Sequence, residues 1–258
     1  MKIAIPHPFN NISEGLAQVI SSIGESQIIW DTQQPIYDLL EKTKPDIMLC
    51  NRQHLRNTVT TALKEYGVKL VNLDDFDIKP AANLAYQNVK YDPKYATDIL
   101  YFSLNTTQEQ SCYLQEIINR QYQIKIVGNK LPLSNYLGMC SANDVIKFMK
   151  SCKIAIVFDI WTLYTYAANK VFCLTDLENE FFPTFSTPEK LMVLLQDYSC
   201  CSADQTRNLA TDRTYHHIIA YHTFFHRAHD LFNQLGYTEQ ADKCLTQLKL
   251  VISQIEMN

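Results

Sequence analysis

Apolar and polar positions repeat one order at the start of the chain: a short apolar run, a polar turn, an amphipathic stretch and another apolar run. This alternation is typical of βαβ units, in which helices connect parallel strands. Gly24 and Gly67 stand at the ends of amphipathic stretches, where a residue with positive φ is favoured. The pattern predicts strands Lys2–Ile5, Gln27–Trp30, Asp46–Cys50 and Lys69–Asn72, and helices Glu14–Ile23, Ile36–Lys42 and Thr58–Tyr66.

The same order returns in residues 89–203, after a polar stretch over residues 76–97 that has no clear periodicity. Lys153–Phe158 is continuously apolar, as expected of a strand buried on both faces. Ser141 followed by Asp144, and Thr187 followed by Pro188, predict the N-termini of two helices. The other elements predicted are strands Asp98–Phe102, Ile124–Val127 and Val171–Leu174, and helices Gln108–Arg120, Ala142–Lys150, Thr162–Ala168 and Glu189–Asp197.

The fold class that follows is α/β, with two Rossmann-like parallel-sheet domains in tandem and a C-terminal helical segment. We expect the domains at residues 1–88 and 89–203, and helices packing across both at residues 204–258. One apolar stripe in the last segment recurs at three- and four-residue steps. Its members are Ala241, Cys244, Leu245, Leu248, Val251, Ile252 and Ile255. The stripe needs a partner surface, either in its own chain or in a second copy within a homodimer.

Composition narrows the class of protein. Lys and Arg total 23 against 27 Asp and Glu, a net charge of −4, so neither nucleic acid nor an anionic membrane is an expected partner. The longest apolar runs, such as Ile154–Phe158, fall well short of the roughly 20 residues of a membrane helix, and the strand at the N-terminus leaves no room for a signal peptide. Eight cysteines without a C-x-x-C spacing favour free thiols. A cytoplasmic protein is expected.

Ligands of open parallel sheets bind beyond the carboxyl ends of the strands, so the loops there are the candidate sites. The chain has only six glycines and neither a G-x-G-x-x-G nor a P-loop motif. Phosphate would then be held at a helix N-terminus, with hydroxyls from Ser103, Thr106 and Thr107. The competing interpretation is that Thr106 or Thr107 only caps its helix.

His7 follows the first predicted strand and is the candidate general base, because an imidazole titrates near neutral pH. The alternative is that His7 only shapes the turn between Pro6 and Pro8. The acidic stretch Asp74–Asp77 is interpreted as a solvated turn, since nothing in the sequence ties it to an apolar pocket.

His222, His226 and His229 would share one face of a helix at i, i+4 and i+7. Zinc is the tempting interpretation. No carboxylate with ligand spacing and no H-E-x-x-H motif accompanies them, so a polar interface is favoured and no metal site is expected.

Several short stretches of the second half together resemble a known family. They are Tyr95–Ser103, Ile124–Gly128, Tyr136–Gly138, Lys153–Val157 and the late Tyr221–Thr223 with Arg227–Ala228. These are similar to the CgeB-like (spore-maturation) glycosyltransferases, which have the two-Rossmann architecture called GT-B. The first half adds a compatible pattern in Gly24, Lys44–Ile47 and Gly67.

The resemblance implies a nucleotide-sugar donor, UDP- or GDP-linked, bound by the second half, an acceptor bound by the first, and chemistry in the cleft between them. It implies no metal and no cofactor. Lys130 would offset diphosphate charge. The donor contacts carried over are Ser103, Asn105, Thr106, Gly128, Asn129, Lys130, Asp159, Thr162 and Thr165, and the acceptor side would be Asn10, Asn11, Arg52 and His54.

This chain departs from the family pattern at the donor site. A glutamate that holds the donor ribose and a glycine before the last strand are replaced by Thr165 and Lys170. A glycine and an arginine expected after the first strand of this half appear as Ser103 or Leu104 and as Gln108 or Gln110. The lost carboxylate removes charge-assisted hydrogen bonds of about 1.5–3 kcal/mol each.

Two hypotheses therefore stand. In the first, the protein is a metal-independent glycosyltransferase of the hexosyltransferase type, with an unknown acceptor. In the second, it is a catalytically inactive GT-B relative that acts as a binding or scaffold protein.

Overall fold

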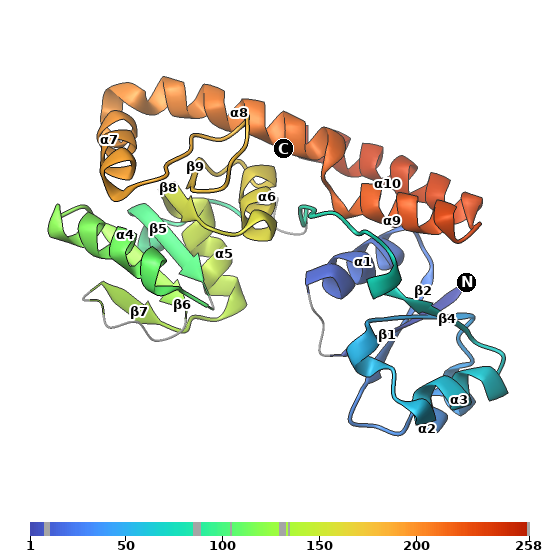
Figure 1. The fold of residues 1–258 in the computed structure, drawn as a ribbon. Helices are drawn as coiled ribbons and strands as arrows, with labels where there is room; N and C mark the ends of the chain where they lie inside the picture. Colours follow the sequence, from blue (N-terminus) through green and yellow to red (C-terminus); the bar gives the residue numbers. More distant parts are fainter. Residues whose placement is uncertain (8–10, 85–88, 104, 129–132, 134, 257–258) are drawn as a thin grey trace. The chain divides into compact units, whose positions relative to one another are not determined.

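The computed structural model describes residues 1–7, 11–84, 89–103, 105–128, 133 and 135–256. Contacts divide the chain into two compact units, unit 1 (Met1–Lys79 with Thr223–Asn258) and unit 2 (Pro80–His222). Each unit has one parallel sheet with helices packed on it (Figure 1), so the predicted α/β class with two Rossmann-like domains and C-terminal helices is confirmed. Contacts place the breaks at 79/80 and 222/223, whereas the composition pattern placed them at 88/89 and 203/204.

Unit 1 has a four-stranded sheet in the order β2-β1-β3-β4, and every pair in it is parallel. Helices α2 and α3 cover one face, where Ala4, Met48 and Cys50 join their apolar residues in a common core. Helix α1 lies on the other face together with α9, and α10 packs on α9 (Figure 1). The strands are β1 (Lys2–His7), β2 (Ser26–Asp31), β3 (Ile47–Cys50) and β4 (Lys69–Asn72), and the helices are α1 (Asn11–Ser22), α2 (Ile36–Thr43), α3 (Asn57–Glu65), α9 (Phe224–Gln234) and α10 (Thr238–Glu256).

Unit 2 has a five-stranded parallel sheet in the order β7-β6-β5-β8-β9. Apolar residues of α4 and α7 pack on one face, around Tyr101 and Ile156, and α5 and α6 contact the sheet at β5 and β8. The strands are β5 (Thr97–Ser103), β6 (Ile124–Gly128), β7 (Tyr136–Gly138), β8 (Cys152–Val157) and β9 (Cys173–Thr175), and the helices are α4 (Gln108–Asn119), α5 (Ala142–Ser151), α6 (Ile160–Ala168), α7 (Pro188–Ser199) and α8 (Asp204–Tyr221). Short 3-10 turns lie at Arg52–His54, Leu73–Asp75, Pro93–Tyr95 and Cys201–Ala203.

Several local predictions are confirmed in detail. Gly24 and Gly67 have φ of 78° and 67°, each two residues beyond the end of its helix, α1 or α3. The Ser141 and Thr187 hydroxyls accept hydrogen bonds from the backbone N–H groups of Asp144 and Lys190, so both residues cap their helices as expected. These signals are local in the sequence, which is why they predict the element ends well.

The interpretation of three histidines on one helical face is wrong. His222 is the C-terminal cap of α8, and Thr223 starts α9 with a capping box in which the His226 ring is the partner. The Thr223 hydroxyl lies 2.8 Å from His226 Nδ1. The chain therefore ends one helix at His222 and begins another after Thr223. His222 belongs to unit 2, while His226 and His229 belong to unit 1.

The apolar stripe of the last helix has part of its partner within unit 1. Ala241, Cys244 and Leu248 of α10 are buried, and α10 packs on α9. Among the described residues, none of the helices combines the length and the apolar run needed to cross a membrane.

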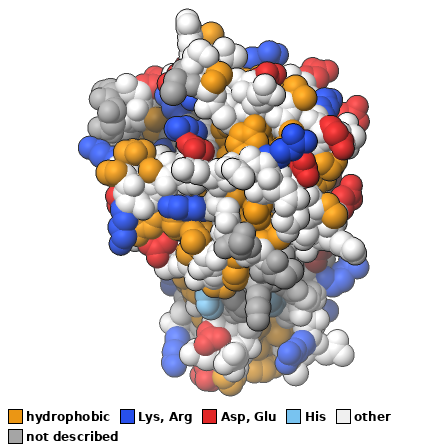
Figure 2. Space-filling model, turned by 90° about the vertical axis from the view of Figure 1, so that its left-hand side faces the viewer, with side chains coloured by type: hydrophobic (Ala, Val, Ile, Leu, Met, Phe, Trp, Pro, Cys, Tyr) orange, Lys and Arg blue, Asp and Glu red, His pale blue; other side chains and the backbone are white. Residues whose placement is uncertain are grey.

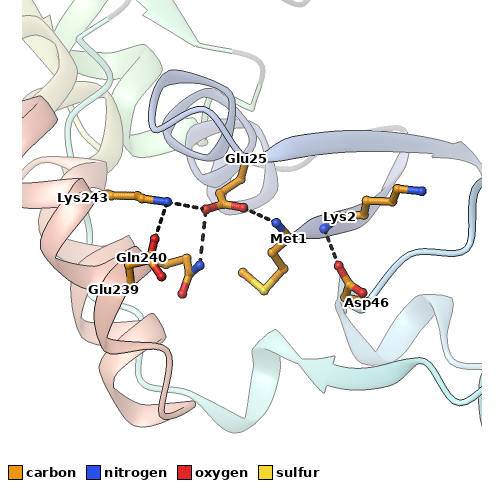
Figure 3. A network of polar contacts seen from close by, with 7 residues as sticks. All are labelled: Met1, Lys2, Glu25, Asp46, Glu239, Gln240 and Lys243. Atoms are coloured by element: carbon orange, nitrogen blue, oxygen red, sulfur yellow. Dashed lines mark hydrogen bonds and ion pairs between the residues drawn. The ribbon is translucent and has the colours of Figure 1, made fainter.

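A buried carboxylate joins the start and the end of unit 1 (Figure 3). Glu25, directly before β2, accepts hydrogen bonds from the Met1 ammonium at 2.6 Å, from Lys243 at 3.1 Å and from Gln240 at 3.3 Å. Burial opposes the charge of Glu25, but these hydrogen bonds outweigh it and lower the pKa of the carboxyl below its ordinary value. The network therefore fixes α10 to the edge of the sheet that carries β2.

Candidate functional site

The strand orders define where each sheet can bind a ligand. In unit 2 the chain builds β5, β6 and β7 outward in one direction and then continues at β8 on the other side of β5. In unit 1 the equivalent change of direction falls between β1 and β3. Loops that leave the carboxyl ends of such strand pairs diverge and leave space, so ligands of open α/β sheets bind there. The candidate site of unit 2 is thus formed by the loops after β5 and β8, beside the end of β6.

The loop after β5 folds back on itself. The Ser103 hydroxyl donates to the Asn105 carbonyl at 3.0 Å and accepts from the Asn105 N–H at 3.1 Å. The Thr106 hydroxyl lies 2.9 Å from the Tyr101 hydroxyl. Thr107 caps α4 in a capping box with Gln110. This agrees with the interpretation that one of the two threonines caps the helix. Ser103 and Thr106 therefore shape the loop, and the N-terminus of α4 faces the same end of the sheet.

Gly128 ends β6 beside Ser103, its register partner on β5. Its φ is +139°, and a Cβ built there would lie 1.8 Å from the Ser103 carbonyl oxygen. The Tyr136 hydroxyl donates to the Gly128 carbonyl at 2.8 Å. Only glycine fits this position, because the two strand ends approach too closely for any side chain. Gly128 is thus a precondition for the shape of this edge.

Asp159, directly after β8, is the N-cap of α6, and its carboxylate accepts from the Thr162 N–H at 2.8 Å. The carboxylate therefore occupies the position where an anion would meet the N-terminus of α6. Thr165 lies farther along α6, where its hydroxyl is 3.5 Å from the Asn83 N–H. Lys170 has φ of 57°, a conformation that favours glycine, and its ammonium lies 4.7 Å from the centre of the Tyr215 ring.

Carboxylates give this edge a negative character. Burial, aided by the charges of Asp159 and Asp176, raises the pKa of Tyr101, although hydrogen bonds from Thr106 and Ser103 act in the opposite direction. Burial and the charge of Glu109 raise the pKa of Asp176, which follows β9. A diphosphate at this edge would need a compensating cation. Lys130, the cation that the sequence analysis proposed, lies outside the described residues, as do Asn129 and Asn10.

The corresponding edge of unit 1 is organised by Asp74, in the turn after β4. Its carboxylate accepts from the Asn51 side chain at 2.7 Å and from the Arg52 N–H at 2.5 Å. These two hydrogen bonds lower the pKa of Asp74. Burial lowers the pKa of His54, and the Asp74 charge opposes that shift. Asp74 is exposed in this turn, as the interpretation as a solvated turn expects, and it also holds the loop after β3 against the end of β4.

The remaining residues of this edge lie at the ends of β1 and β3. His7 is exposed at the end of β1, and its carbonyl accepts from the N–H of Thr32 at 3.2 Å. The Arg52 guanidinium lies 3.5 Å from the Asp75 carboxylate, and both side chains are exposed. Asn11 is the first residue of α1. The structure brings the carboxyl ends of β1 and β3 to one edge, since β1 and β3 are neighbouring strands.

Sequence reasoning missed the residues that shape these edges from a distance. Tyr101 and Asp74 each bind a candidate loop, although Tyr101 lies inside an apolar run and Asp74 lies far from Asn51 in the sequence. The signal for Asp74 was its place directly after a predicted strand, the same rule that selected Arg52. For Tyr101 the signal was its position in an apolar strand, because the hydroxyl of a buried tyrosine needs a hydrogen-bond partner.

Within the described part of the chain, no group of three or more His, Cys, Asp or Glu side chains is arranged to hold a metal ion. On the face drawn in Figure 2, basic and acidic side chains are interspersed, and no extended area carries one sign of charge. The described residues at these edges therefore offer polar loops, two helix N-termini and scattered carboxylates.

No protein-family model matches this chain, and no curated protein matches its sequence. The fold is similar to that of a glycosyltransferase from Rickettsia africae, with a TM-score of 0.56, 13% identity, and coverage of 97% of this chain and 98% of that one. It is also similar to HepE from Anabaena, solved in complex with UDP-glucose, with a TM-score of 0.55, 10% identity, and coverage of 95% and 99%.

A third similar structure is the UDP-GlcNAc 2-epimerase from Neisseria meningitidis bound to UDP-GlcNAc, with a TM-score of 0.51, 8% identity, and coverage of 83% of this chain and 96% of that one. The identities are low, so these similarities establish the architecture. The chain has the two-domain GT-B fold that glycosyltransferases and this epimerase share.

Proposed function

We propose that the protein is a GT-B glycosyltransferase that transfers a sugar from a UDP- or GDP-linked donor to an acceptor. The observation that supports this proposal most is that the shared fold and the polar loops occur together. A fold shared over nearly its whole length with a glycosyltransferase carries polar loops at the β5/β8 edge of unit 2 and at the β1/β3 edge of unit 1.

The donor would bind at the β5/β8 edge of unit 2. Ser103, Asn105, Thr106 and Gly128 would meet it from β5 and β6, and Asp159, Thr162 and Thr165 from α6. Asn129 and Lys130 complete the proposed set, with Lys130 facing the diphosphate charge. Because Asp159 already caps α6, the diphosphate would lie nearer the N-terminus of α4.

The acceptor would bind at the β1/β3 edge of unit 1, with Asn10, Asn11, Arg52 and His54 as its contacts. His7 would act as the general base that takes the proton from the acceptor hydroxyl while the glycosidic bond to the nucleotide breaks. The resemblance to the CgeB-like family and a cytoplasmic location belong to this same proposal.

The alternative is a GT-B relative without catalysis. It is favoured by the local use of the donor-side groups, since Asp159 and Thr107 cap helices and Ser103 bonds within its own loop. A further alternative is a UDP-GlcNAc 2-epimerase, since the similar structure from Neisseria meningitidis is such an enzyme, and NMR of the incubated UDP-GlcNAc would detect its 2-epimer.

The test is release of nucleoside diphosphate from a panel of UDP- and GDP-sugars, measured alongside calorimetric binding of the same panel. A transferase is expected to bind one donor and release its diphosphate slowly to water, and His7→Gln is expected to abolish release while donor affinity stays unchanged. Binding without release would establish the inactive relative, and formation of the 2-epimer of UDP-GlcNAc would establish the epimerase. Absence of binding across the panel would overturn the proposal.

A further inference from the structure

A pocket lies in unit 2 at the end of the sheet's edge strand β9, beside the start of α6. It has a volume of about 230 Å³. Its walls are the first turns of α6, the loop that follows β9 and the last turns of α8. The residues that line it are Ile160, Leu163, Tyr164, Leu177, Glu178, Asn179, Glu180, Phe181, Phe182, His217, Ile218 and His222.

The loop after β9 is a built wall. Thr175 and Thr184 form a bridge at its base. Inside the loop, the Asn179 side chain donates to the Leu177 carbonyl at 2.7 Å and accepts from the N–H groups of Phe181 at 2.9 Å and Phe182 at 2.6 Å. The Asn179 side chain therefore makes its hydrogen bonds within the loop and fixes the loop backbone. The wall is thus formed without a ligand.

Aromatic rings form the opposite side. Phe181 stacks on His217 with ring centres 3.6 Å apart and an interplanar angle of 16°. His222 lies 5.0 Å from His217 and 4.9 Å from Tyr164, again between ring centres. Tyr221, beside this group, has its ring centre 5.4 Å from that of His217. Aromatic and imidazole rings therefore make up much of the lining of the pocket.

The charges at the pocket are mainly negative. Glu178 and Glu180 are exposed, and neither forms an ion pair with a described residue. Burial lowers the pKa of His217 and so favours the neutral form of that ring. The Arg213 guanidinium lies 5.9 Å from the centre of the Phe181 ring, and Arg213 is not among the residues that line the pocket.

We propose that this pocket binds a small organic ammonium cation. Ring faces attract a cation within about 6 Å through the aromatic quadrupole, and the carboxylates of Glu178 and Glu180 add Coulombic attraction. The same carboxylates repel a phosphate or a carboxylate ligand. The pocket adjoins the proposed donor site, since Ile160, Leu163 and Tyr164 share the first turns of α6 with Asp159, Thr162 and Thr165. Its ligand class follows from the rings and carboxylates of the pocket and does not depend on the proposed function.

The experiment uses choline and its uncharged analogue 3,3-dimethylbutan-1-ol, titrated into the full chain by calorimetry and by NMR of the histidine side chains. Choline is expected to bind at least tenfold more tightly than the alcohol and to shift the His217 and His222 signals. The double variant Glu178→Gln/Glu180→Gln is expected to weaken choline binding at least fivefold. Arg213→Gln is expected to strengthen it, because the variant removes the neighbouring positive charge.

Asp197→Asn, which removes an exposed carboxylate from α7 away from the pocket, is the matched control and is expected to leave affinity unchanged. Each variant is checked for an unchanged melting temperature, and Tyr164→Leu offers a second route if a loop variant fails to fold. Equal affinities for choline and the alcohol, no binding of either, or an affinity that the two glutamine substitutions leave unaltered would overturn the proposal.

Discussion

Single residues at the carboxyl edges of the sheets have structural roles in addition to any role in binding a ligand. Gly128 allows two strand ends to approach, Asp159 caps α6 and Asp74 holds the loop after β3. Residue types selected for their chemistry, such as Asp, Ser and Thr, are also those that cap helices and close turns. A candidate list built on residue type therefore mixes both roles, and variants are needed to separate them.

Gly128→Ala is expected to destabilise unit 2 by about 3 kcal/mol or more, because its Cβ would collide with the Ser103 carbonyl oxygen in addition to the cost of a positive φ. Gly138→Ala is the matched control, since Gly138 also has positive φ, 89°, but no atom within 4 Å of its added Cβ. Urea denaturation measures both. Equal losses in the two variants would show that the close approach at Gly128 is absent.

Glu25 gives unit 1 a pH-dependent stability. Its pKa in the folded state is lowered, so its contribution is fully present above the unfolded pKa, about 4.5, and is lost as pH falls through the lower folded pKa. Glu25→Gln is expected to reduce the free energy of unfolding by about 1–3 kcal/mol at pH 7. The difference between wild type and variant should shrink below about pH 4. A difference that stays constant from pH 3 to pH 7 would contradict the role of the charge.

At the scale of the element, the strands and helices follow from local pattern and their packing does not. Gly15 lies in α1, where a Cβ would be 2.3 Å from the Phe224 ring of α9. The sequence separation of these two residues is so large that no periodicity connects them. The prediction of α1 was thus correct, while the reason for a glycine in it appears only in the packing of α1 on α9.

Gly15→Ala is expected to destabilise unit 1 by about 1–3 kcal/mol through overpacking, although alanine favours an isolated helix by about 0.5–1 kcal/mol over glycine. The double variant Gly15→Ala/Phe224→Leu is expected to lose less than the sum of its two single variants, since the smaller side chain makes room. Thermal melts of the four proteins measure this coupling. Strict additivity would contradict the contact.

The sequence predicted both sheets because each strand signal is short and local. Every predicted strand and helix up to α7 has a counterpart in the structure, with ends that differ by a few residues. The edge strand β7 was not predicted, because Tyr136–Gly138 is too short to show a period. The single helical segment predicted after residue 204 is broken at His222 and Thr223, where a capping box that ends in histidine has no familiar sequence signature.

At the scale of the whole molecule, the sequence predicts the fold better than it predicts the pockets and sites. The GT-B architecture follows from two successive βαβ series, and the strand ends point to the right loops. The pocket of Phe181, His217 and His222 was not predicted, because it joins a loop after β9 to the end of α8. Contacts between segments so far apart depend on the tertiary fold, which periodicity does not describe.

The most direct test is NMR mapping of UDP on the amide-labelled 29.8 kDa chain. UDP is expected to shift the amides of Ser103–Thr107, Gly128 and Asp159–Thr162, and to leave those of Leu177–Phe182 unchanged. Shifts confined to the loop after β9, or a spectrum that saturating UDP leaves unaltered, would contradict a nucleotide-sugar site at the β5/β8 edge.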